Sequence, residues 1–133
     1  MIEFKETKLF SKEDVVELFK SVNWPEANYP DKLFAALQNS ETVICAFDGD
    51  KLVGLIRVLD DGEIFAIIHF LLVNPAYQGM HIASDLVKLA KEKYKDIMYF
   101  KVVPIDEGAK KFYLKQGFKE SHNADCLIIS NLE

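Results

Sequence analysis

The sequence predicts a mixed α/β (α+β) fold: a mostly antiparallel sheet that contains a central parallel βαβ unit and carries helices on both faces. Two β-rich runs flank an Asp-Gly turn at 48–51, which predicts a hairpin. Over 63–103 an apolar run, an amphipathic helix pattern and a second strand pattern follow one another, as in a parallel βαβ unit. Further helix patterns before the hairpin and after this unit supply the covering layers.

The first part of the chain predicts a strand and two helices. A short strand covers 2–5, and Ser11 then suits the N-cap position ahead of apolar residues at helical spacing as far as Val22. The Asn-Trp-Pro segment at 23–25 ends that helix. A second helix begins at Pro30 and fades over 38–40.

The middle of the chain predicts the sheet and its longest helix. The hairpin strands cover 42–47 and 52–59, and a turn at 60–62 leads into an apolar run over 63–73. Residues 64–68 show no polar alternation, which favours a central strand covered on both faces. The helix at 79–94 has one apolar stripe with lysines opposite, formed by Ile82, Leu86, Leu89 and Ala90. A strand at 97–103 follows.

The last part predicts a helix over 106–116, which Gly117 ends in the C′ position. Phe118 and the run 126–129 are expected to complete the sheet. The edge strand at 126–129 could pair between subunits, so the protein is expected to be a monomer or a homodimer. Cys45 and Cys126 lie in apolar strand-like runs, so both are expected to be buried and reduced.

Composition excludes several classes of function. With 133 residues, half of them hydrophobic, we expect a single domain over 1–133. A formal charge of −5 without a basic stripe argues against a nucleic-acid partner. The absence of a long apolar run or a signal-like start predicts a cytoplasmic protein with no membrane partner. The three histidines and two cysteines lack zinc-like spacing, so no metal is expected.

The most informative segment is 71–84, where an apolar strand ends, a tight turn follows, and a helix begins with glycine and small residues. Backbone N–H groups at a helix N-terminus, together with the positive end of the helix dipole, form an anion site. The simpler alternative is that Gly79 only makes a turn. The segment has no Gly-Lys-Ser/Thr of a Walker loop and no G-x-G-x-x-G fingerprint.

Three motifs, together with the order of helices and strands, resemble the GCN5-related N-acetyltransferase (GNAT) superfamily over nearly the whole chain. Residues 71–75 and 78–83 are similar to the family's strand end and acyl-CoA loop, 109–118 to its A-x-x-hydrophobic-Tyr-x-x-x-Gly-Phe helix and turn, and 52–58 to its hairpin strand. Two residues depart from the pattern: His81 stands where the family usually has glycine, and Asp106 where many members have asparagine.

The resemblance implies a transferase, an N-acetyltransferase that moves the acetyl group of acetyl-CoA (coenzyme A) directly to a primary amine of a small molecule such as an amino acid or polyamine. A protein N-terminus or lysine is an alternative acceptor. Two non-enzymatic alternatives are an acyl-CoA-binding module, suggested by His81, and a plain interaction domain that does not bind coenzyme A.

The resemblance also implies roles for individual residues. The backbone of 71–73 pairs with the pantetheine arm, and the N–H of Val73 polarises the acetyl carbonyl. Tyr113 corresponds to the family's tyrosine that protonates the coenzyme A thiolate, although it could simply pack beside Phe112. The implied cofactor-binding set is Leu71, Leu72, Val73, Gln78, Gly79, Met80, His81, Ile82, Ala83, Ser84, Asp106 and Phe112.

The base and the acceptor site are less constrained by the sequence. His69 is a candidate base with a pKa suited to neutral pH, Glu63 is the runner-up, and a dedicated base is not required. Trp24 and Tyr29 lie in the segment that often forms a wall of the acceptor site in this family, where Phe34 is expected to be core. Arg57 could hold a carboxylate of the acceptor, or pair with Asp60 or Asp61.

Overall fold

The structure is a computed structural model, and it describes residues 1–121 and 126–131. It has two compact units, Met1–Val102 and Val103–Glu133. The first contains β1 (Ile2–Glu6), α1 (Lys12–Ser21), the 3-10 turn η1 (Pro25–Asn28), α2 (Pro30–Gln38), β2 (Thr42–Asp48), β3 (Lys51–Asp60), β4 (Phe65–Val73), the 3-10 turn η2 (Pro75–Tyr77), α3 (Ile82–Lys93) and β5 (Tyr99–Val102). The second contains α4 (Glu107–Lys115).

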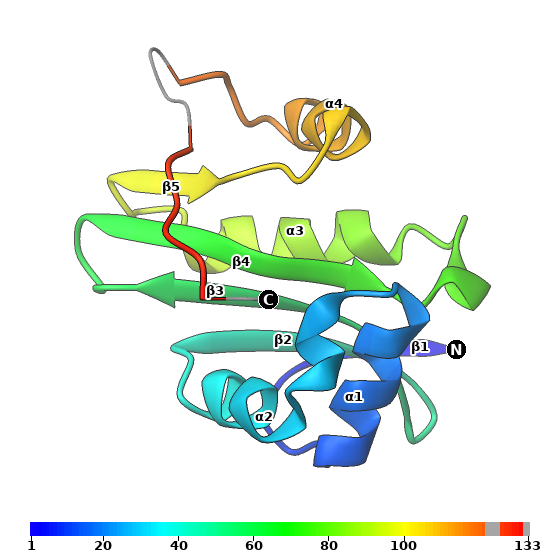
Figure 1. Ribbon diagram of the computed structural model, residues 1–133. Helices are drawn as coiled ribbons and strands as arrows, with labels where there is room; N and C mark the ends of the chain where they lie inside the picture. The colour runs from blue at the N-terminus through cyan, green and yellow to red at the C-terminus, as the bar shows by residue number, and fades with distance from the viewer. Residues whose placement is uncertain (122–125, 132–133) are drawn as a thin grey trace. The chain divides into compact units, whose positions relative to one another are not determined.

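The strands of the first unit form one sheet in the order β1-β2-β3-β4-β5 (Figure 1). Every neighbouring pair is antiparallel except β4 and β5, which are parallel and are connected in the sequence by α3. The predicted hairpin is present as β2 and β3, which meet at the pair Asp48 and Lys51 with Gly49 at φ 60°. The predicted mixed sheet with its parallel βαβ unit is therefore confirmed.

Helices cover both faces of this sheet. Residues alternate between faces along a strand, so Gly54 and Leu55 of β3 point to opposite sides. A side chain at Gly54 would meet Ile82 of α3, whereas Leu55 belongs to a core cluster with Phe19 of α1 and Leu33 of α2. Thus α1 and α2 lie on one face and α3 on the other (Figure 1).

Local sequence signals fix the first helix as predicted. Ser11 caps α1 with a reciprocal pair of bonds: its hydroxyl accepts from the N–H of Asp14 at 3.0 Å, and the Asp14 carboxylate accepts from the N–H of Ser11. Val15, Leu18 and Phe19 then bury one face of the helix against the sheet.

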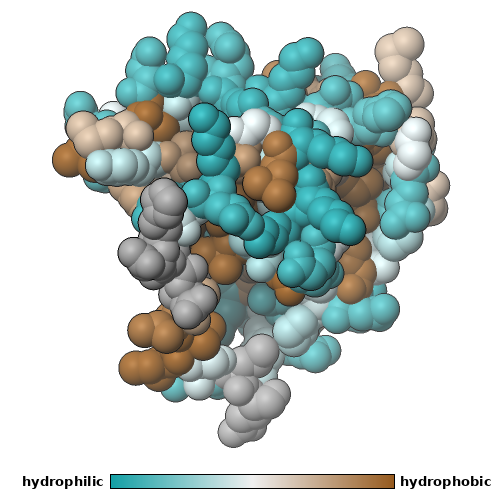
Figure 2. All heavy atoms as spheres, turned by 90° about the horizontal axis from the view of Figure 1, so that it is seen from above, coloured by the Kyte–Doolittle hydropathy of each residue, from teal (hydrophilic) through white to brown (hydrophobic). Residues whose placement is uncertain are grey.

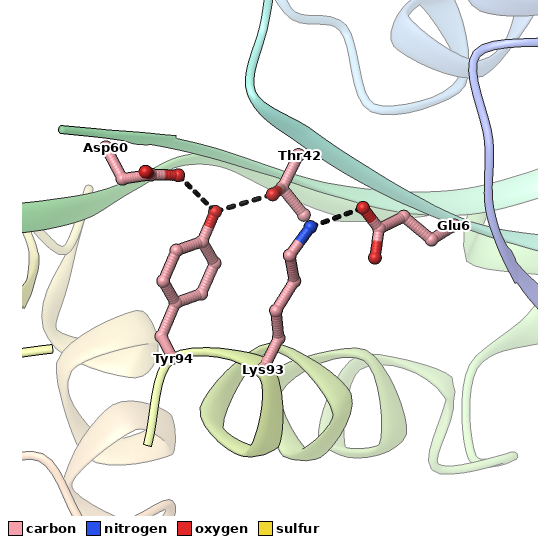
Figure 3. Close-up of polar contacts among 5 residues, drawn as sticks. All are labelled: Glu6, Thr42, Asp60, Lys93 and Tyr94. Carbon is pink, nitrogen blue, oxygen red and sulfur yellow. Dashed lines mark hydrogen bonds and ion pairs between the residues drawn. The ribbon is translucent and has the colours of Figure 1, made fainter. Parts of the chain in front are cut away.

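A polar network ties the end of α3 to the sheet (Figure 3). The Tyr94 hydroxyl donates to the Asp60 carboxylate, and its oxygen lies 2.5 Å from the hydroxyl oxygen of Thr42. Because the phenol hydrogen is used on Asp60, Thr42 must donate the second bond. Beside it, Lys93 pairs with Glu6 of β1. Burial, then the hydrogen bond to Asp60, raises the pKa of Tyr94 well above its ordinary value.

Four local predictions are wrong. The structure gives 126–131 no strand and leaves Cys126 exposed, because β propensity makes a strand only where a neighbouring backbone completes the hydrogen bonds. Phe118 comes just after the end of α4 and likewise lies in no strand. On α3 the buried stripe contains Val87, whereas Leu89 is exposed, because the buried arc of the helix extends from Ile82 past Ala90 to Val87 and leaves Leu89 outside it.

The run 64–68 is covered less evenly than predicted. Ala66 and Ile68 are buried, but Phe65 and Ile67 on the opposite face are half-buried and Ile64 lies exposed before the strand begins. No helix among the described residues is long and apolar enough to cross a bilayer. Figure 2 shows one face of the protein, on which hydrophilic side chains predominate and hydrophobic atoms form separate patches.

Candidate active site

A β-bulge in the middle of β4 shapes the candidate site. The register with β3 passes from the pair Ile56 and Leu71 to the pair Val58 and Ile68. Arg57 therefore faces two residues of β4, His69 and Phe70. Phe70 has a φ of 81°, a left-handed conformation that is costly for a bulky side chain. The bulge turns both residues toward the face on which Arg57 lies.

The pairing between β4 and β5 ends at the bulge. The parallel ladder joins residues 65–68 of β4 to β5, and among the described residues no strand pairs with the outer edge of 69–73. The N–H of Asn74 donates to the carbonyl of Val53 on β3 at 2.8 Å. Because N–H groups alternate sides along a strand, those of Leu71 and Val73 point to the open edge.

The loop after β4 leads into an exposed helix N-terminus. Asn74 accepts from the N–H of Ala76 at 3.0 Å and starts η2, and left-handed residues Gly79 (φ 82°) and His81 (φ 61°) follow. The carbonyl of His81 accepts from Asp85 at 2.9 Å in the first bond of α3, and the N–H groups of the first turn of a helix point toward its N-terminal end. This arrangement can bind an anion.

His81 keeps the backbone conformation that glycine would adopt at this position. It is the N-cap of α3, its side chain is exposed, and it makes no capping hydrogen bond. Histidine tolerates the left-handed region better than most residues. The turn therefore forms with histidine at the position where the family usually has glycine.

Arg57 and His69 form the polar centre of the bulged face. The Arg57 Nε donates to the Ser40 hydroxyl at 2.7 Å, and its NH1 lies 2.6 Å from His69 Nδ1. Its guanidinium carbon lies 5.3 Å from the centre of the Phe70 ring. Arg57 thus pairs with neither Asp60, which accepts from Tyr94, nor Asp61, whose carboxylate accepts backbone N–H groups.

Electrostatics keep His69 neutral near pH 7. Burial lowers its pKa most, the charge of Arg57 lowers it further, and Glu26 of η1 acts in the opposite direction. Burial likewise lowers the pKa of Arg57, with Glu41 opposing. Arginine remains charged at neutral pH despite such a shift.

The other predicted residues of the first unit divide into two groups. Trp24 packs against Phe19 and against Phe70, 6.0 Å between ring centres, and so borders the bulged face. Tyr29 is exposed and Phe34 packs edge-on against Phe10 in the core. Glu63 lies in the turn before β4, six residues from His69, and the structure does not bring the two together.

In the second unit, Tyr113 packs against the rings of Phe112 and Phe118 on α4 and the turn that follows it. Burial raises the pKa of Tyr113 to about 12. Asp106 is the N-cap of α4 and accepts from the N–H of Ala109 at 2.7 Å. The motif 109–118 therefore folds as the predicted helix and turn.

Sequence reasoning missed three residues around Arg57 and His69: Ser40, Phe70 and Glu26. Ser40 is buried and donates to the Ala36 carbonyl while it accepts from Arg57. No sequence signal marks Phe70, because an apolar residue in an apolar run does not reveal a bulge. Glu26 follows Pro25 in the segment already singled out for its aromatic residues, and that proximity was the available signal.

Comparison with known proteins identifies the family. The sequence profile of the Acetyltransferase (GNAT) family matches residues 9–118. The chain belongs to the GNAT acetyltransferases. A GNAT-family acetyltransferase from Streptococcus pneumoniae is 32% identical over all of both chains, with a TM-score of 0.84. No curated protein matches the chain.

Two further solved structures share the fold. A probable acetyltransferase from methicillin-resistant Staphylococcus aureus is 23% identical over 98% of this chain and 99% of its own, with a TM-score of 0.82. A putative acetyltransferase from Deinococcus radiodurans is 20% identical over 98% and 89%, also with a TM-score of 0.82.

Family membership makes this GNAT protein an acyltransferase, and the family uses acetyl-CoA as co-substrate. The open edge of β4 and the N-terminus of α3 are the features of this chain suited to that molecule. Among the described residues, no group of three or more histidine, cysteine or acidic side chains could hold a metal ion.

Proposed function

We propose that this GNAT protein transfers the acetyl group of acetyl-CoA directly to the primary amine of a small molecule. The observation that carries the proposal is the open edge of β4 beside an anion-binding helix N-terminus. An extended amide chain can pair with the N–H groups of Leu71 and Val73 as an added strand. The pyrophosphate would then lie against the backbone of 78–84.

The side chains around this edge support the same assignment. Gln78, Gly79, Met80 and His81 form the connecting loop, and Ile82, Ala83 and Ser84 open α3. The Leu72 side chain is buried and fixes β4 to the core, so its role is to hold the strand. The proposed contact of Asp106 and Phe112 with the co-substrate rests on the family resemblance.

Transfer joins the amine nitrogen to the thioester carbonyl carbon and breaks the carbon–sulfur bond. The nitrogen loses a proton and the departing thiolate gains one. A donor aimed at the carbonyl oxygen stabilises the charge that develops there, and we assign this role to the N–H of Val73. Bound acetyl-CoA supplies the activated acyl group.

Tyr113 is our candidate acid, a role that rests on the family resemblance. Its raised pKa of about 12 keeps the phenol protonated at neutral pH, so it can donate a hydrogen bond to the departing sulfur. A thiol with a pKa near 8.5 is a stronger acid than this phenol, so Tyr113 can give its proton to the sulfur only if it is reprotonated. In balance, the proton gained by the sulfur is the one lost by the amine nitrogen. We therefore propose that Tyr113 stabilises the developing thiolate and relays a proton.

The amine proton has two possible acceptors, His69 and water. His69 is the candidate base, but its Nδ1 accepts from Arg57, so the neutral ring carries its hydrogen on Nε2. To act as a base, His69 must release Arg57 and use Nδ1. Loss of the proton to water, without a dedicated base, requires no such movement.

The experiment is calorimetric titration with acetyl-CoA, followed by measurement of coenzyme A release with a panel of small amines. We expect micromolar binding and amine-dependent release. Tyr113→Phe should keep binding within about threefold and lower kcat at least tenfold. Absence of acetyl-CoA binding by the native protein would overturn the proposed function.

A further inference from the structure

Arg57 carries a positive charge that no described residue neutralises in an ion pair. It is the sole arginine of the chain and is half-buried on β3. Among the described residues no carboxylate lies within ion-pair distance of its guanidinium. A partly desolvated cation without an anion is costly, whereas most surface charges remain fully hydrated. Its placement therefore calls for an explanation.

The guanidinium is held rigidly from one side. Ser40, itself buried and satisfied, accepts from Nε at 2.7 Å, and His69 accepts from NH1 at 2.6 Å. The Phe70 ring lies 5.3 Å from the guanidinium carbon. Two of the five N–H groups are used in these bonds, which leaves three for a ligand. A fixed fork of this kind suits the two oxygens of a carboxylate.

His69 adds a donor to the same site. Because Arg57 donates to Nδ1, the neutral ring has its hydrogen on Nε2. His69 is partly desolvated by its neighbours but remains open to solvent as a residue, and we infer that this N–H is available to a ligand. The arginine and histidine of the bulge thus present donors and positive charge, which fits recognition of an anion.

Two carboxylates act on this pair, one from η1 and one from the segment just before β2. Glu26 of η1 acts on His69, and Glu41, just before β2, acts on Arg57. Glu41 is already used, because its carboxylate accepts from the N–H of Asp60 at 2.9 Å. Glu26 is half-buried and provides a negative charge on the side of the helical turn. A ligand that carries both an ammonium and a carboxylate matches this distribution.

We propose that Arg57, supported by Ser40 and His69, binds the carboxylate of an acceptor amine, so that the preferred substrates are small amino acids. The proposal rests on the proposed function, because it names the acceptor class of the same site. His69 lies two residues before Leu71, about 7 Å along the strand, on which the acyl group is proposed to bind.

The first test uses matched acceptors. Alanine and β-alanine are compared with alaninamide and β-alaninamide, which keep the amine and replace the carboxylate. We expect Arg57→Gln to raise KM about 10- to 100-fold for the acids and less than threefold for the amides, with kcat little changed. Arg57→Lys should restore part of the difference, because it keeps the charge and loses the fork.

Lys20→Gln is the matched control, since it removes one positive charge from an exposed position on α1. It should leave the ratio of acid to amide unchanged. Equal losses for acids and amides in Arg57→Gln would overturn the proposal and give the arginine a structural role. Weaker acetyl-CoA binding in this variant would also overturn it, because the guanidinium would then hold the co-substrate.

A second test does not depend on activity or on a variant that folds. In nitrogen-15-labelled native protein, the sole arginine gives a single Nε–H signal in the NMR spectrum. Titration with propionate or alanine should shift this signal with saturation, and alaninamide should not. An unchanged signal at saturating carboxylate would overturn the inference. Binding of propionate without any acetyl transfer would instead refute the proposed function alone.

Discussion

Replacing Tyr94 by phenylalanine tests how the polar network holds α3 against the sheet (Figure 3). The change removes one oxygen and leaves the ring in place. It strips the hydrogen-bond acceptor from the Thr42 hydroxyl, which is 1% exposed and lies 2.5 Å from the phenol oxygen. Asp60 is half-exposed and can be hydrated instead.

The expected loss follows from these exposures. An unpaired buried hydroxyl costs about 1–3 kcal/mol, and water replaces most of the bond to Asp60. We expect Tyr94→Phe to lower the free energy of unfolding by about 2 kcal/mol, which is a fall of about 7 °C in Tm for a chain of this size. Urea unfolding at pH 7 measures the change.

A double substitution isolates the network. Thr42→Val with Tyr94→Phe removes both partners, so no buried hydroxyl is left unpaired, and the pair should cost at least 1 kcal/mol less than the two single changes added together. Additive single effects, or a loss below about 0.5 kcal/mol for Tyr94→Phe, would refute the reasoning.

The same variant has a defined pH dependence. Since the folded pKa of Tyr94 lies above its ordinary value of 10.0, its stabilising contribution is present below pH 10. It is lost as the pH rises from there toward the raised pKa. The stability difference between native protein and Tyr94→Phe should therefore shrink by about 1.4 kcal/mol per pH unit above pH 10.

Three other predictions concern the site and the thiols. Gly54→Ala places a methyl carbon 3.2 Å from the Leu72 carbonyl oxygen, so we expect a loss of about 1–3 kcal/mol in urea unfolding and weaker acetyl-CoA binding; an unchanged stability would contradict this. His81→Gly should change stability by less than about 1 kcal/mol, and tenfold tighter acetyl-CoA binding by calorimetry would show that the side chain obstructs the site. Cys126 should react rapidly with a thiol reagent, whereas Cys45, with a pKa raised by burial to about 12, should react only on unfolding; two fast thiols would disprove that burial.

The strained backbone of Phe70 links the bulge to the position of Arg57. A bulky residue at φ 81° costs about 1–3 kcal/mol, yet its ring packs with Phe19 and Trp24 and lies under Arg57. The surrounding core holds this conformation in place. The strained residue therefore ties the shape of the β4 edge to the position of the arginine.

The outline of the fold could be predicted because its signals are local. The cap at Ser11, the Asp-Gly turn before Lys51 and the helix stop at Gly117 each depend on residues a few positions apart. Family motifs around Val73 and Tyr113 added the expected chemistry. The run 126–129 shows the limit of such signals, because strand propensity does not specify a pairing partner.

By itself, the sequence determined the order of helices and strands from β1 to α4, the parallel unit around α3 and the acyltransferase family. Only the tertiary structure decided which face His69 occupies and what Arg57 contacts. A single extra residue in β4 turns His69 toward the arginine, and that insertion depends on the register between β3 and β4. Strand register is set by packing between distant segments, so it cannot be predicted from local sequence patterns.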